Sequence, residues 1–420
     1  MHRIRILIST GIFPNRVRGN RGVYNLKLAL ALREYCELRV VAPVPYLPGF
    51  VRSGAYTAYA AVPRRDVIEG FDVLYPRYFV TPKVFRSTHG FTLYASVVGK
   101  YRRIVAEFQP DLILGFFAYP YGFANVLLGR TFRLPVVTSC RGSDIHSIAQ
   151  NFLQGRLIAW ALRRCARVFS VSGALKRDIV ALGVDPEHIS VISNGIEPDR
   201  FTTMGKIEAR RRLGIPEAGR VAVCVSRLSP EKGVDVLVES APYLHGSDVR
   251  IVIVGDGPQQ HELERRAREL GVSDRIMFAG DRPHGEVPFW VCAGDVFVLP
   301  SRKEGYPNAV VEALACGRPV VAARVGGVPE IVTGEDLGFL VAPEQPQELA
   351  RALDRSLEKE WDHQYIAACG RKRDWNTVAQ EMLREFERIL GRTPFGPAGT
   401  SAGADEPVSG AAALHKWGQS

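Results

Sequence analysis

The chain has 420 residues, of which 46% are hydrophobic and 23% charged, and its formal net charge is +10. This length exceeds one ordinary hydrophobic core, so two or three domains are expected, and the composition is that of a folded chain. No apolar run reaches the roughly 18 residues of a membrane span, and the N-terminus lacks the apolar core of a signal peptide. We therefore expect a cytoplasmic protein without a transmembrane helix.

Cysteine and histidine spacing argues against a structural metal or a disulfide framework. The seven cysteines are scattered without a Cys-x-x-Cys pair, and the nine histidines show no metal-ligand spacing. This usage is typical of a protein in a reducing compartment.

The charge is unevenly distributed. Residues 1–198 contain 26 Lys and Arg against 12 Asp and Glu, whereas the rest contain 28 against 32, which gives +14 and −4. A basic half suits nucleic acid, an anionic membrane surface or a phosphorylated ligand; the alternative is a solvated basic surface that only maintains solubility.

Short apolar runs alternate with stretches of helical period in the first half. Strands are expected at 4–9, 38–43, 111–116, 135–139, 167–172 and 189–193, and helices at 22–35, 92–107 and 152–165. Strands that are apolar on both sides and separated by helices are typical of parallel sheets covered on both faces. Residues 1–198 are therefore predicted to form one Rossmann-like α/β domain.

The same alternation restarts after a polar connector at 194–220. Strands are expected at 221–226, 249–255, 275–280, 295–300 and 319–323, and helices at 233–244, 259–270 and 309–315. A second Rossmann-like domain is predicted over 199–375, followed by an amphipathic helix at 376–390. Residues 391–420 are rich in Gly, Ala, Ser and Pro and are predicted to be a disordered tail.

The segment SRKEGYPNAVVEALACG places two carboxylates around a loop and a helix start. Asn308 is a favoured N-cap, so the next backbone N–H groups lack helical partners and form a natural phosphate site. Glu312, one turn into the helix, is placed for vicinal hydroxyls such as those of a ribose, and Glu304 is placed at the mouth for a second ring. The alternative is a loop carboxylate and a carboxylate that compensates the helix dipole.

Two cations follow another predicted strand. Arg227 and Lys232 lie five residues apart in SRLSPEKG, and this pair suits a diphosphate, although a basic surface loop explains it too. Gly255 begins a tight turn into the next helix, but Gln260 departs from the dinucleotide-binding fingerprint.

Two loops of the first half add candidates. Gly19 and Gly22 would let the backbone approach a phosphate from the opposite wall of a cleft. The segment TSCRGSDIHS follows a strand and gathers Arg141, Asp144 and His146 near the same edge. His146 is better explained as a capping or packing residue.

The segments RLSPEKG, VGDGP, PSRKEGYPNAVVEALACGRPVVAARVGGVPEIV and VISNGIEPDRF together resemble the retaining glycosyltransferases of family 4. The resemblance extends over about residues 3–390 and is strongest to bacterial enzymes of the exopolysaccharide and teichuronic-acid type. It implies the GT-B architecture, in which two Rossmann-like domains face a cleft and a C-terminal helix crosses back to the first domain.

The resemblance also implies residue roles. Arg227 and Lys232 would hold the diphosphate of a nucleotide-sugar donor, Glu312 would bind ribose and Glu304 the donor sugar. Asp144 is expected to be catalytic with Arg227, Lys232 and Glu304. Further donor-binding residues are expected to be Gly22, Arg141, Gly255, Gly305, Tyr306, Pro307 and Asn308. Many family members have a histidine where this chain has Arg141, so no catalytic role passes to that residue.

The implied reaction transfers a sugar to a glycan or lipid-linked acceptor in cell-surface polysaccharide synthesis. We expect neither a metal nor another cofactor, because there is no Asp-x-Asp motif and two cations can face the leaving diphosphate. Two alternatives stay open. A nucleotide-sugar epimerase would need acid–base groups over the sugar, for which only Asp144 and His146 are candidates, and a nonenzymatic nucleotide-sugar-binding protein would need none.

A basic and aromatic segment suggests a further partner. No acidic residue occurs between Asp72 and Glu107, while six cations and seven aromatic residues are interleaved from Tyr75 to Arg103. We expect residues 77–103 to dock on an anionic membrane surface rather than on nucleic acid. The alternative is a core helix at 92–107 with its aromatic residues facing inward.

Overall fold

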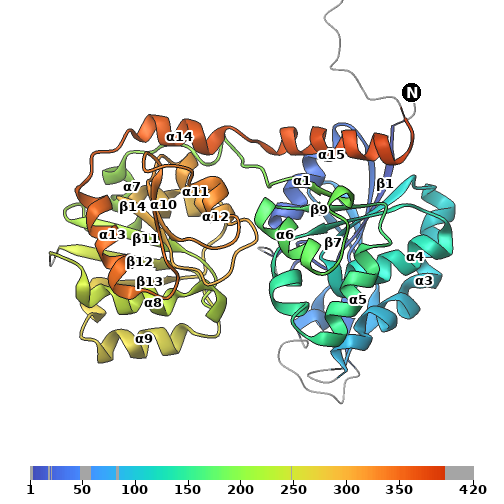
Figure 1. The fold of residues 1–420 in the computed structure, drawn as a ribbon, viewed down its shortest axis with the longest axis horizontal. Coiled ribbons are helices and arrows are strands. Elements are labelled where there is room, and N and C mark those ends of the chain that lie inside the picture. The colour runs from blue at the N-terminus through green and yellow to red at the C-terminus, as the bar shows by residue number, and fades with distance from the viewer. Residues whose placement is uncertain are drawn as a thin grey trace, which may run out of the picture.

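The computed structural model describes residues 3–392 apart from 18, 20, 48–57, 82–84 and 247. The predicted tail, beyond residue 392, lies outside the described residues. Two lobes stand side by side in Figure 1, and each contains its own parallel sheet with helices on both faces.

The first lobe is built on an eight-stranded sheet in the order β10-β9-β8-β7-β1-β2-β5-β4. Its strands are β1 (Arg5–Ser9), β2 (Glu37–Val41), β4 (Arg65–Ile68), β5 (Phe71–Leu74), β7 (Leu112–Phe116), β8 (Val136–Cys140), β9 (Arg167–Ser170) and β10 (Ile189–Val191). All neighbours are parallel except β4 and β5, which pair antiparallel as a hairpin. The central strand β7 is buried along its whole length, as expected for a strand covered on both faces.

The covering helices of this lobe are α1 (Val23–Arg33), α3 (His89–Phe108), α4 (Phe123–Phe132), α5 (Phe152–Leu162) and α6 (Gly173–Ala181). A small separate sheet pairs β3 (Val44–Tyr46) with β6 (Arg77–Phe79). The four strands from β3 to β6 were not predicted because each is short and contains a proline or a charged residue, so none forms a continuous apolar run.

The second lobe is built on a six-stranded parallel sheet in the order β13-β12-β11-β14-β15-β16. The strands are β11 (Arg220–Val225), β12 (Val249–Val254), β13 (Ile276–Gly280), β14 (Val296–Leu299), β15 (Val320–Ala323) and β16 (Gly338–Val341). Around them lie α7 (Lys206–Leu213), α8 (Val234–Ser240), α9 (Gln260–Glu269), α10 (Val287–Ala293), α11 (Asn308–Ala315), α12 (Val328–Ile331) and α13 (Pro346–Glu358). The edge strand β16 was not predicted.

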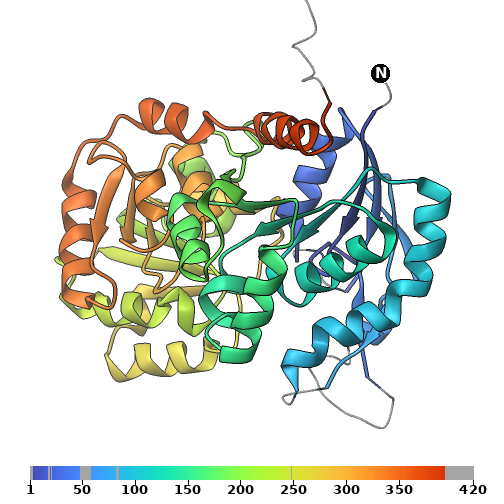
Figure 2. The same ribbon diagram turned by 45° about the vertical axis from the view of Figure 1, so that its right-hand side comes forward.

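The chain then returns to the first lobe. α14 (His363–Arg371) packs on α11 of the second lobe, and α15 (Trp375–Ile389) continues across the top of the molecule onto α1 (Figure 1). Val378, Met382 and Phe386, spaced four residues apart on one helical face, are buried in the core of the first lobe. Figure 2 shows α15 lying along that lobe from a second direction. The predicted fold, two Rossmann-like domains with a returning helix, is confirmed.

Candidate active site between the two domains

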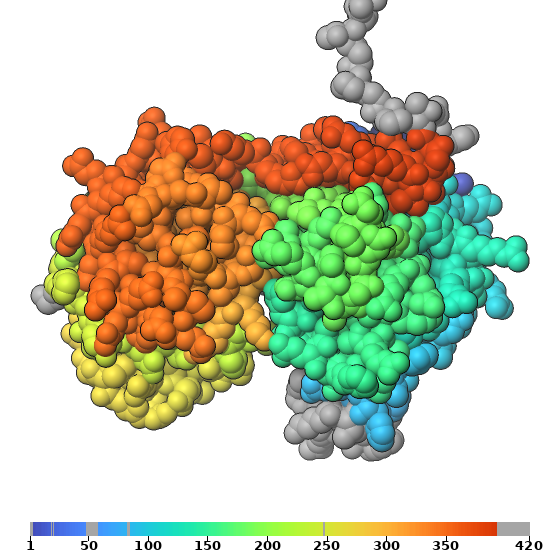
Figure 3. All heavy atoms as spheres, viewed as in Figure 1, coloured from blue at the N-terminus to red at the C-terminus, as the bar shows by residue number. Residues whose placement is uncertain are grey.

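A cavity of about 450 Å³ lies where the carboxyl ends of the two sheets face each other. This position is the usual ligand site of open α/β sheets. The two lobes meet at mid-height in Figure 3, and a notch opens between them below the contact. The cavity is lined by Ile12, Gly22, Tyr24, Asn25, Phe117, Arg141, Asn194, Val225, Ser226, Arg227, Lys232, Leu299, Glu304, Tyr306, Pro307, Asn308 and Ala309.

The wall from the second domain contains the two predicted cations. Arg227 is exposed at the cavity and, within the described part of the chain, its side chain makes no hydrogen bond or ion pair. Lys232 Nζ lies 2.7 Å from Glu304 Oε1, which also accepts a hydrogen bond from the Ser301 hydroxyl. The sequence analysis placed Glu304 at the mouth of the cleft. In the structure Glu304 is only 7% exposed, so it lies buried in the cavity wall.

The start of α11 differs from the prediction by one residue. Pro307 is the N-cap and the helix begins at Asn308, whose side chain makes no capping hydrogen bond. Instead, Asn308 Oδ1 accepts a hydrogen bond from Asn194 Nδ2 of the interdomain connector at 2.9 Å. The first N–H groups of the helix therefore still lack a side-chain cap beside the cavity.

Glu312 is held within the interface instead of bordering the cavity. Its carboxylate is 3% exposed and accepts hydrogen bonds from the Tyr24 hydroxyl at 2.9 Å and His284 Nε2 at 3.3 Å. Burial, followed by the negative charge of Glu312, raises the pKa of Tyr24 well above its usual value. Among the described residues that line the cavity, Tyr24 is present and Glu312 is not.

The first domain contributes the start of α1. Gly22 is the N-cap residue with φ of 85°, and a Cβ there would lie 2.6 Å from the carbonyl oxygen of Ile12. Only glycine fits this turn without strain. The turn brings Tyr24 and Asn25 onto the cavity wall, where Asn25 Nδ2 is bonded to Ile12 O at 2.7 Å.

Arg141 is engaged by the protein itself. Its guanidinium donates to Asn194 Oδ1 at 2.5 Å and Asn25 Oδ1 at 3.0 Å, and it lies over the Phe116 ring at 4.8 Å. Burial lowers the pKa of Arg141 to about 10. Its Nε is buried and, among the described atoms, has no partner.

Asp144 is buried inside its loop. Its carboxylate accepts hydrogen bonds from the backbone N–H groups of Ala118, Arg141 and Gly142 at 2.8–3.1 Å, and its burial raises its pKa. The described lining of the cavity does not include Asp144, and its catalytic role stays a prediction from the sequence. His146 pairs with Asp178 at 2.8 Å, also away from the cavity.

Glycines allow the two domains to touch. A Cβ on Gly305 would lie 2.4 Å from the carbonyl oxygen of Arg141, so the backbones pass at a distance that only glycine permits. The Gly305 carbonyl accepts a hydrogen bond from Ser172 Oγ at 2.8 Å. Gly255, in contrast, packs against the main chain of Ser226 and, in the part of the chain described, lies off the cavity wall.

A second contact closes the same side of the interface. Both oxygens of Glu330 accept hydrogen bonds from the N–H groups of Gly173 and Ala174 at 2.8 and 2.7 Å. A carboxylate of the second domain thus caps α6 of the first, a position where the helix dipole favours a negative charge.

The sequence interpretation missed Tyr24, Asn25, Phe117 and Asn194 of the wall. Asn194 stands next to Gly195 in the polar connector, to which the sequence analysis assigned no site residue. Tyr24 and Asn25 directly follow the Gly22 turn, so their place at a helix start was the available signal.

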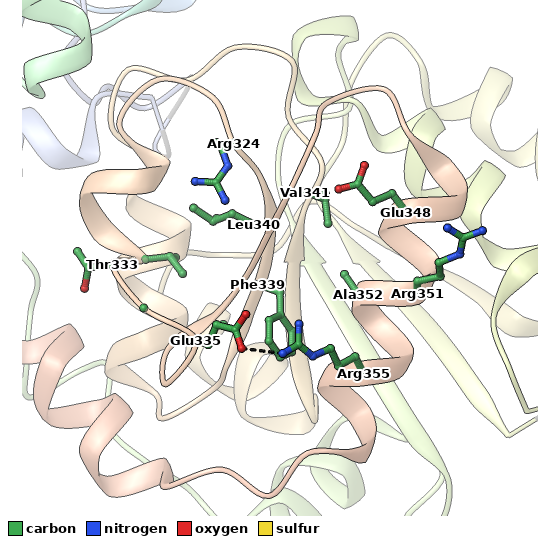
Figure 4. A pocket seen from close by; sticks show the side chains of 13 residues that line it. Arg324, Thr333, Glu335, Phe339, Leu340, Val341, Glu348, Arg351, Ala352 and Arg355 are labelled. Atoms are coloured by element: carbon green, nitrogen blue, oxygen red, sulfur yellow. Dashed lines mark hydrogen bonds and ion pairs between the residues drawn. The ribbon is translucent and has the colours of Figure 1, made fainter.

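Elsewhere, a pocket of about 380 Å³ lies along the edge strand β16 (Figure 4). Glu335 and Arg355 form an ion pair across it at 2.6 Å, and it shares no described residue with the cavity between the domains. In the described chain, no group of three or more His, Cys, Asp or Glu residues could hold a metal ion. None of the described helices is long and apolar enough to cross a membrane.

Two Rossmann-like domains that enclose a polar cavity and share a crossing helix define the GT-B architecture. Comparison with solved structures agrees. Sucrose-phosphate synthase from Thermosynechococcus elongatus aligns with a TM-score of 0.74 at 19% identity, over 93% of this chain and all of that one. HepE from Anabaena, solved in complex with UDP, aligns with a TM-score of 0.70 at 23% identity, over 92% of this chain and all of that one.

Sequence comparison gives the family. The family model "Glycosyltransferase Family 4" matches residues 20–200, and "Glycosyl transferases group 1" matches residues 205–373. TuaC of Bacillus subtilis, a protein assigned to teichuronic acid biosynthesis as a glycosyltransferase, is 31% identical over 86% of this chain and 90% of its own. The 2-deoxystreptamine glucosyltransferase of Streptomyces kanamyceticus is 33% identical over 56% of this chain and 63% of its own length. The chain belongs to the group 1 and family 4 glycosyltransferases.

Proposed function

We propose that this glycosyltransferase takes its sugar from a nucleotide-diphosphate donor and transfers it with retention to a glycan or lipid-linked acceptor in cell-surface polysaccharide synthesis. The observation that carries the proposal is the second-domain wall. Arg227 and Lys232 line the same cavity as the uncapped start of α11, so three electropositive groups converge on one space.

This arrangement suits a diphosphate leaving group. The bond between the anomeric carbon and the diphosphate oxygen breaks, and the diphosphate leaves with the electron pair. Arg227, Lys232 and the helix start stabilise the charge that develops there. The acceptor hydroxyl oxygen bonds to the same face of the anomeric carbon, and its proton passes to the departing diphosphate oxygen. No protein nucleophile and no metal is required in this scheme.

The unpaired side chain of Arg227 supports this scheme over the two alternatives. An epimerase needs acid–base groups over the sugar, but Asp144 is consumed by backbone bonds and His146 by Asp178. A merely binding protein has no need for an unpaired arginine aimed at a leaving group. TuaC and HepE support, respectively, a polysaccharide product and a uridine diphosphate donor.

A donor panel tests the proposal. Purified protein is incubated with several nucleotide-diphosphate sugars, and released nucleotide is measured together with the anomeric configuration of any product by NMR. We expect slow hydrolysis or transfer of one donor, with a product that keeps the donor's configuration. Inversion, an epimerised donor, or binding of every donor without turnover would each contradict the proposal.

The acceptor side includes an exposed surface suited to a membrane. Phe85 is 71% exposed and Phe91 49% exposed, and Arg86 lies between them at the N-terminal end of α3. Tyr75, Tyr78 and Tyr101 of the predicted segment are buried, and the core-helix alternative holds for Tyr101, which lies on α3. Lys83 lies outside the described residues. We propose that this end of α3 docks on the cytoplasmic face of an anionic membrane.

Co-sedimentation with vesicles tests the docking. Replacing Phe85 and Phe91 by Ser and Arg86 by Gln should abolish binding to anionic vesicles. Arg102→Gln with Arg103→Gln is the matched control, because these residues lie 16 or more positions further along, about 24 Å on a helix. Equal binding to neutral vesicles, or equal loss in both variants, would contradict the docking surface.

A further inference from the structure

A second hollow adjoins the cavity between the two domains, which is called the donor cavity below. It encloses about 660 Å³ between η4 (Asp144–Ile148) and α6 of the first domain and residues 302–304 and 324–329 of the second. Glu304 lines both this hollow and the donor cavity, so the two spaces meet at the residue beside Lys232. A ligand in the hollow would therefore end next to the place where the donor sugar is expected.

The hollow continues outward along α5. A neighbouring hollow of about 660 Å³ shares Ala149, Gln150 and Leu182 with it, so the two form one groove. This acceptor-side groove, as we name the two hollows together, extends from Glu304 to the exposed N-terminal part of α5. A groove that begins at the reacting centre and continues over the surface is suited to a chain of several units.

The acceptor-side groove is strongly basic. Its described lining includes six cations besides His146 and the ion-paired Arg302: Arg156, Arg163, Arg164, Arg177, Lys303 and Arg324. The two carboxylates in the described lining are already engaged, Asp178 by His146 and Glu304 by Lys232. The described lining therefore has more cationic than anionic side chains and a net excess of positive charge.

Within the described chain, three of these arginines lack a carboxylate partner, although Arg156 lies over the Phe152 ring at 5.6 Å. Arg156, Arg177 and Arg324 are exposed, and none of them has a carboxylate partner among the described residues. They come from three different elements, α5, α6 and the loop after β15, so the charge follows the groove and not one helix face. Arginine binds planar carboxylates and phosphates through paired N–H donors.

Aromatic side chains stand beside the cations. Trp160 is half-buried in the outer half of the groove with Arg164 over one side of its ring at 4.6 Å, and Phe152 at the end of the groove is 76% exposed. Exposed aromatic surfaces of this kind mark binding sites, because they provide a rigid apolar face with little loss of side-chain entropy. Sugar rings offer matching apolar C–H faces, whereas simple anions do not.

We propose that the acceptor-side groove binds an acidic glycan, an oligosaccharide that carries a carboxylate or phosphate group on several of its units, with its acceptor end at Glu304. This inference rests on the proposed sugar transfer and adds the class of acceptor. The arginines bind the anionic groups, and Trp160 and Phe152 contact the sugar faces.

Direct binding without donor tests the groove. The probes are a hyaluronan hexasaccharide, an oligomer of ribitol phosphate and neutral chitohexaose, titrated by calorimetry into the full chain at low and physiological salt. The first two arms separate carboxylate from phosphate. Binding of either acidic probe, weakened by salt, with no binding of chitohexaose supports the proposal. Failure of both acidic probes, or equal binding of the neutral one, overturns it.

Matched variants localise the binding. R156Q/R177Q/R324Q should weaken binding of the acidic probe at least tenfold, whereas R250Q/R268Q/R384Q, which removes three exposed charges elsewhere, should change it less than twofold. Equal effects of the two triple variants, or equally tight binding of a single-stranded RNA of the same charge, would overturn the assignment.

Donor hydrolysis separates the two proposals. It should be the same in the wild type and both triple variants, since none of the six arginines touches the donor cavity. Absence of donor turnover in the wild type would refute the proposed function, while acidic-glycan binding would still report on the groove alone.

Discussion

The two walls of the central cavity differ in how much of their polar chemistry is already used. On the first-domain wall, Arg141 is bonded to Asn25 and Asn194, and Asp144 beside it accepts three backbone bonds. On the second-domain wall, the Arg227 side chain has no hydrogen bond or ion pair within the described chain, and the α11 start has no side-chain cap. One wall is held rigid by its own contacts, and the other keeps groups available for a ligand.

This difference separates residues that build the site from residues that act in it. Buried groups whose bonds are all internal cost stability when they are removed. Removal of groups that face the cavity without partners should instead lower donor affinity or turnover. Substitutions on the two walls should therefore change different measurements.

The largest effect is expected from Asp144→Ala, and it should be on folding. The change leaves three buried N–H groups without an acceptor, at roughly 1–3 kcal/mol each, so the free energy of unfolding should fall by about 3 kcal/mol or more. Urea unfolding followed by circular dichroism measures it. Asp144→Asn, which keeps one oxygen, should lose less. An Asp144→Asn protein as stable as the wild type but about 100-fold slower in turnover would instead restore the catalytic role expected from sequence.

The cation pair should act mainly on turnover, and Arg227 should act on turnover alone. Arg227→Ala and Lys232→Ala should each lower turnover about 100-fold or more, equivalent to about 2.7 kcal/mol of transition-state stabilisation. The double variant should lose less than the product, because both cations serve one diphosphate. Arg227→Ala should keep the thermal midpoint of the wild type.

Lys232 needs its own control because it also neutralises buried Glu304. Lys232→Ala leaves that carboxylate unpaired and should destabilise the protein. Adding Glu304→Gln should recover stability without recovering turnover. Full turnover in Arg227→Ala would show that Arg227 does not stabilise the leaving diphosphate.

The fold was largely predictable from the sequence, because long buried strands and amphipathic helices leave an unambiguous period. All eleven predicted strands were found within about two residues, including the fully apolar β7. The strands that escaped prediction, β3 to β6 and β16, are short or lie at the edge of a sheet. Their position depends on pairing with distant segments, which local pattern does not reveal.

The site was predictable on one wall more than the other. Arg227 and Lys232 follow a strand in the same domain as α11, so sheet topology alone brings them together. The contacts of Glu312 with Tyr24, 288 positions away, and of Asn308 with Asn194 depend on how two domains meet. Sequence periodicity contains no information on that docking, and for this reason Glu312 was expected to border an open cleft.

Glu312 provides a smaller, sharper test because it lies at the junction of the walls. If its carboxylate exchanges Tyr24 for ribose hydroxyls, Glu312→Ala should weaken donor binding by roughly 1–3 kcal/mol. Tyr24→Phe retains the carboxylate and should change affinity less than threefold. Calorimetry with the donor identified by the panel measures both. Unchanged affinity in Glu312→Ala would limit this residue to the contact between domains.

The smallest effect should come from removing divalent metal. If Arg227 and Lys232 already provide the positive charge that a leaving diphosphate needs, a metal ion adds little, and turnover in excess EDTA should stay within about twofold of the untreated rate. The informative comparison is with Arg227→Ala. In this variant the charge of the leaving diphosphate is no longer neutralised by the arginine, so added magnesium should raise the turnover. Rescue of that variant by magnesium, with no effect on the wild type, would show that the cation occupies the role of a metal. If EDTA abolishes wild-type turnover and magnesium restores it, Arg227 and Lys232 are not sufficient and the reaction needs a metal ion.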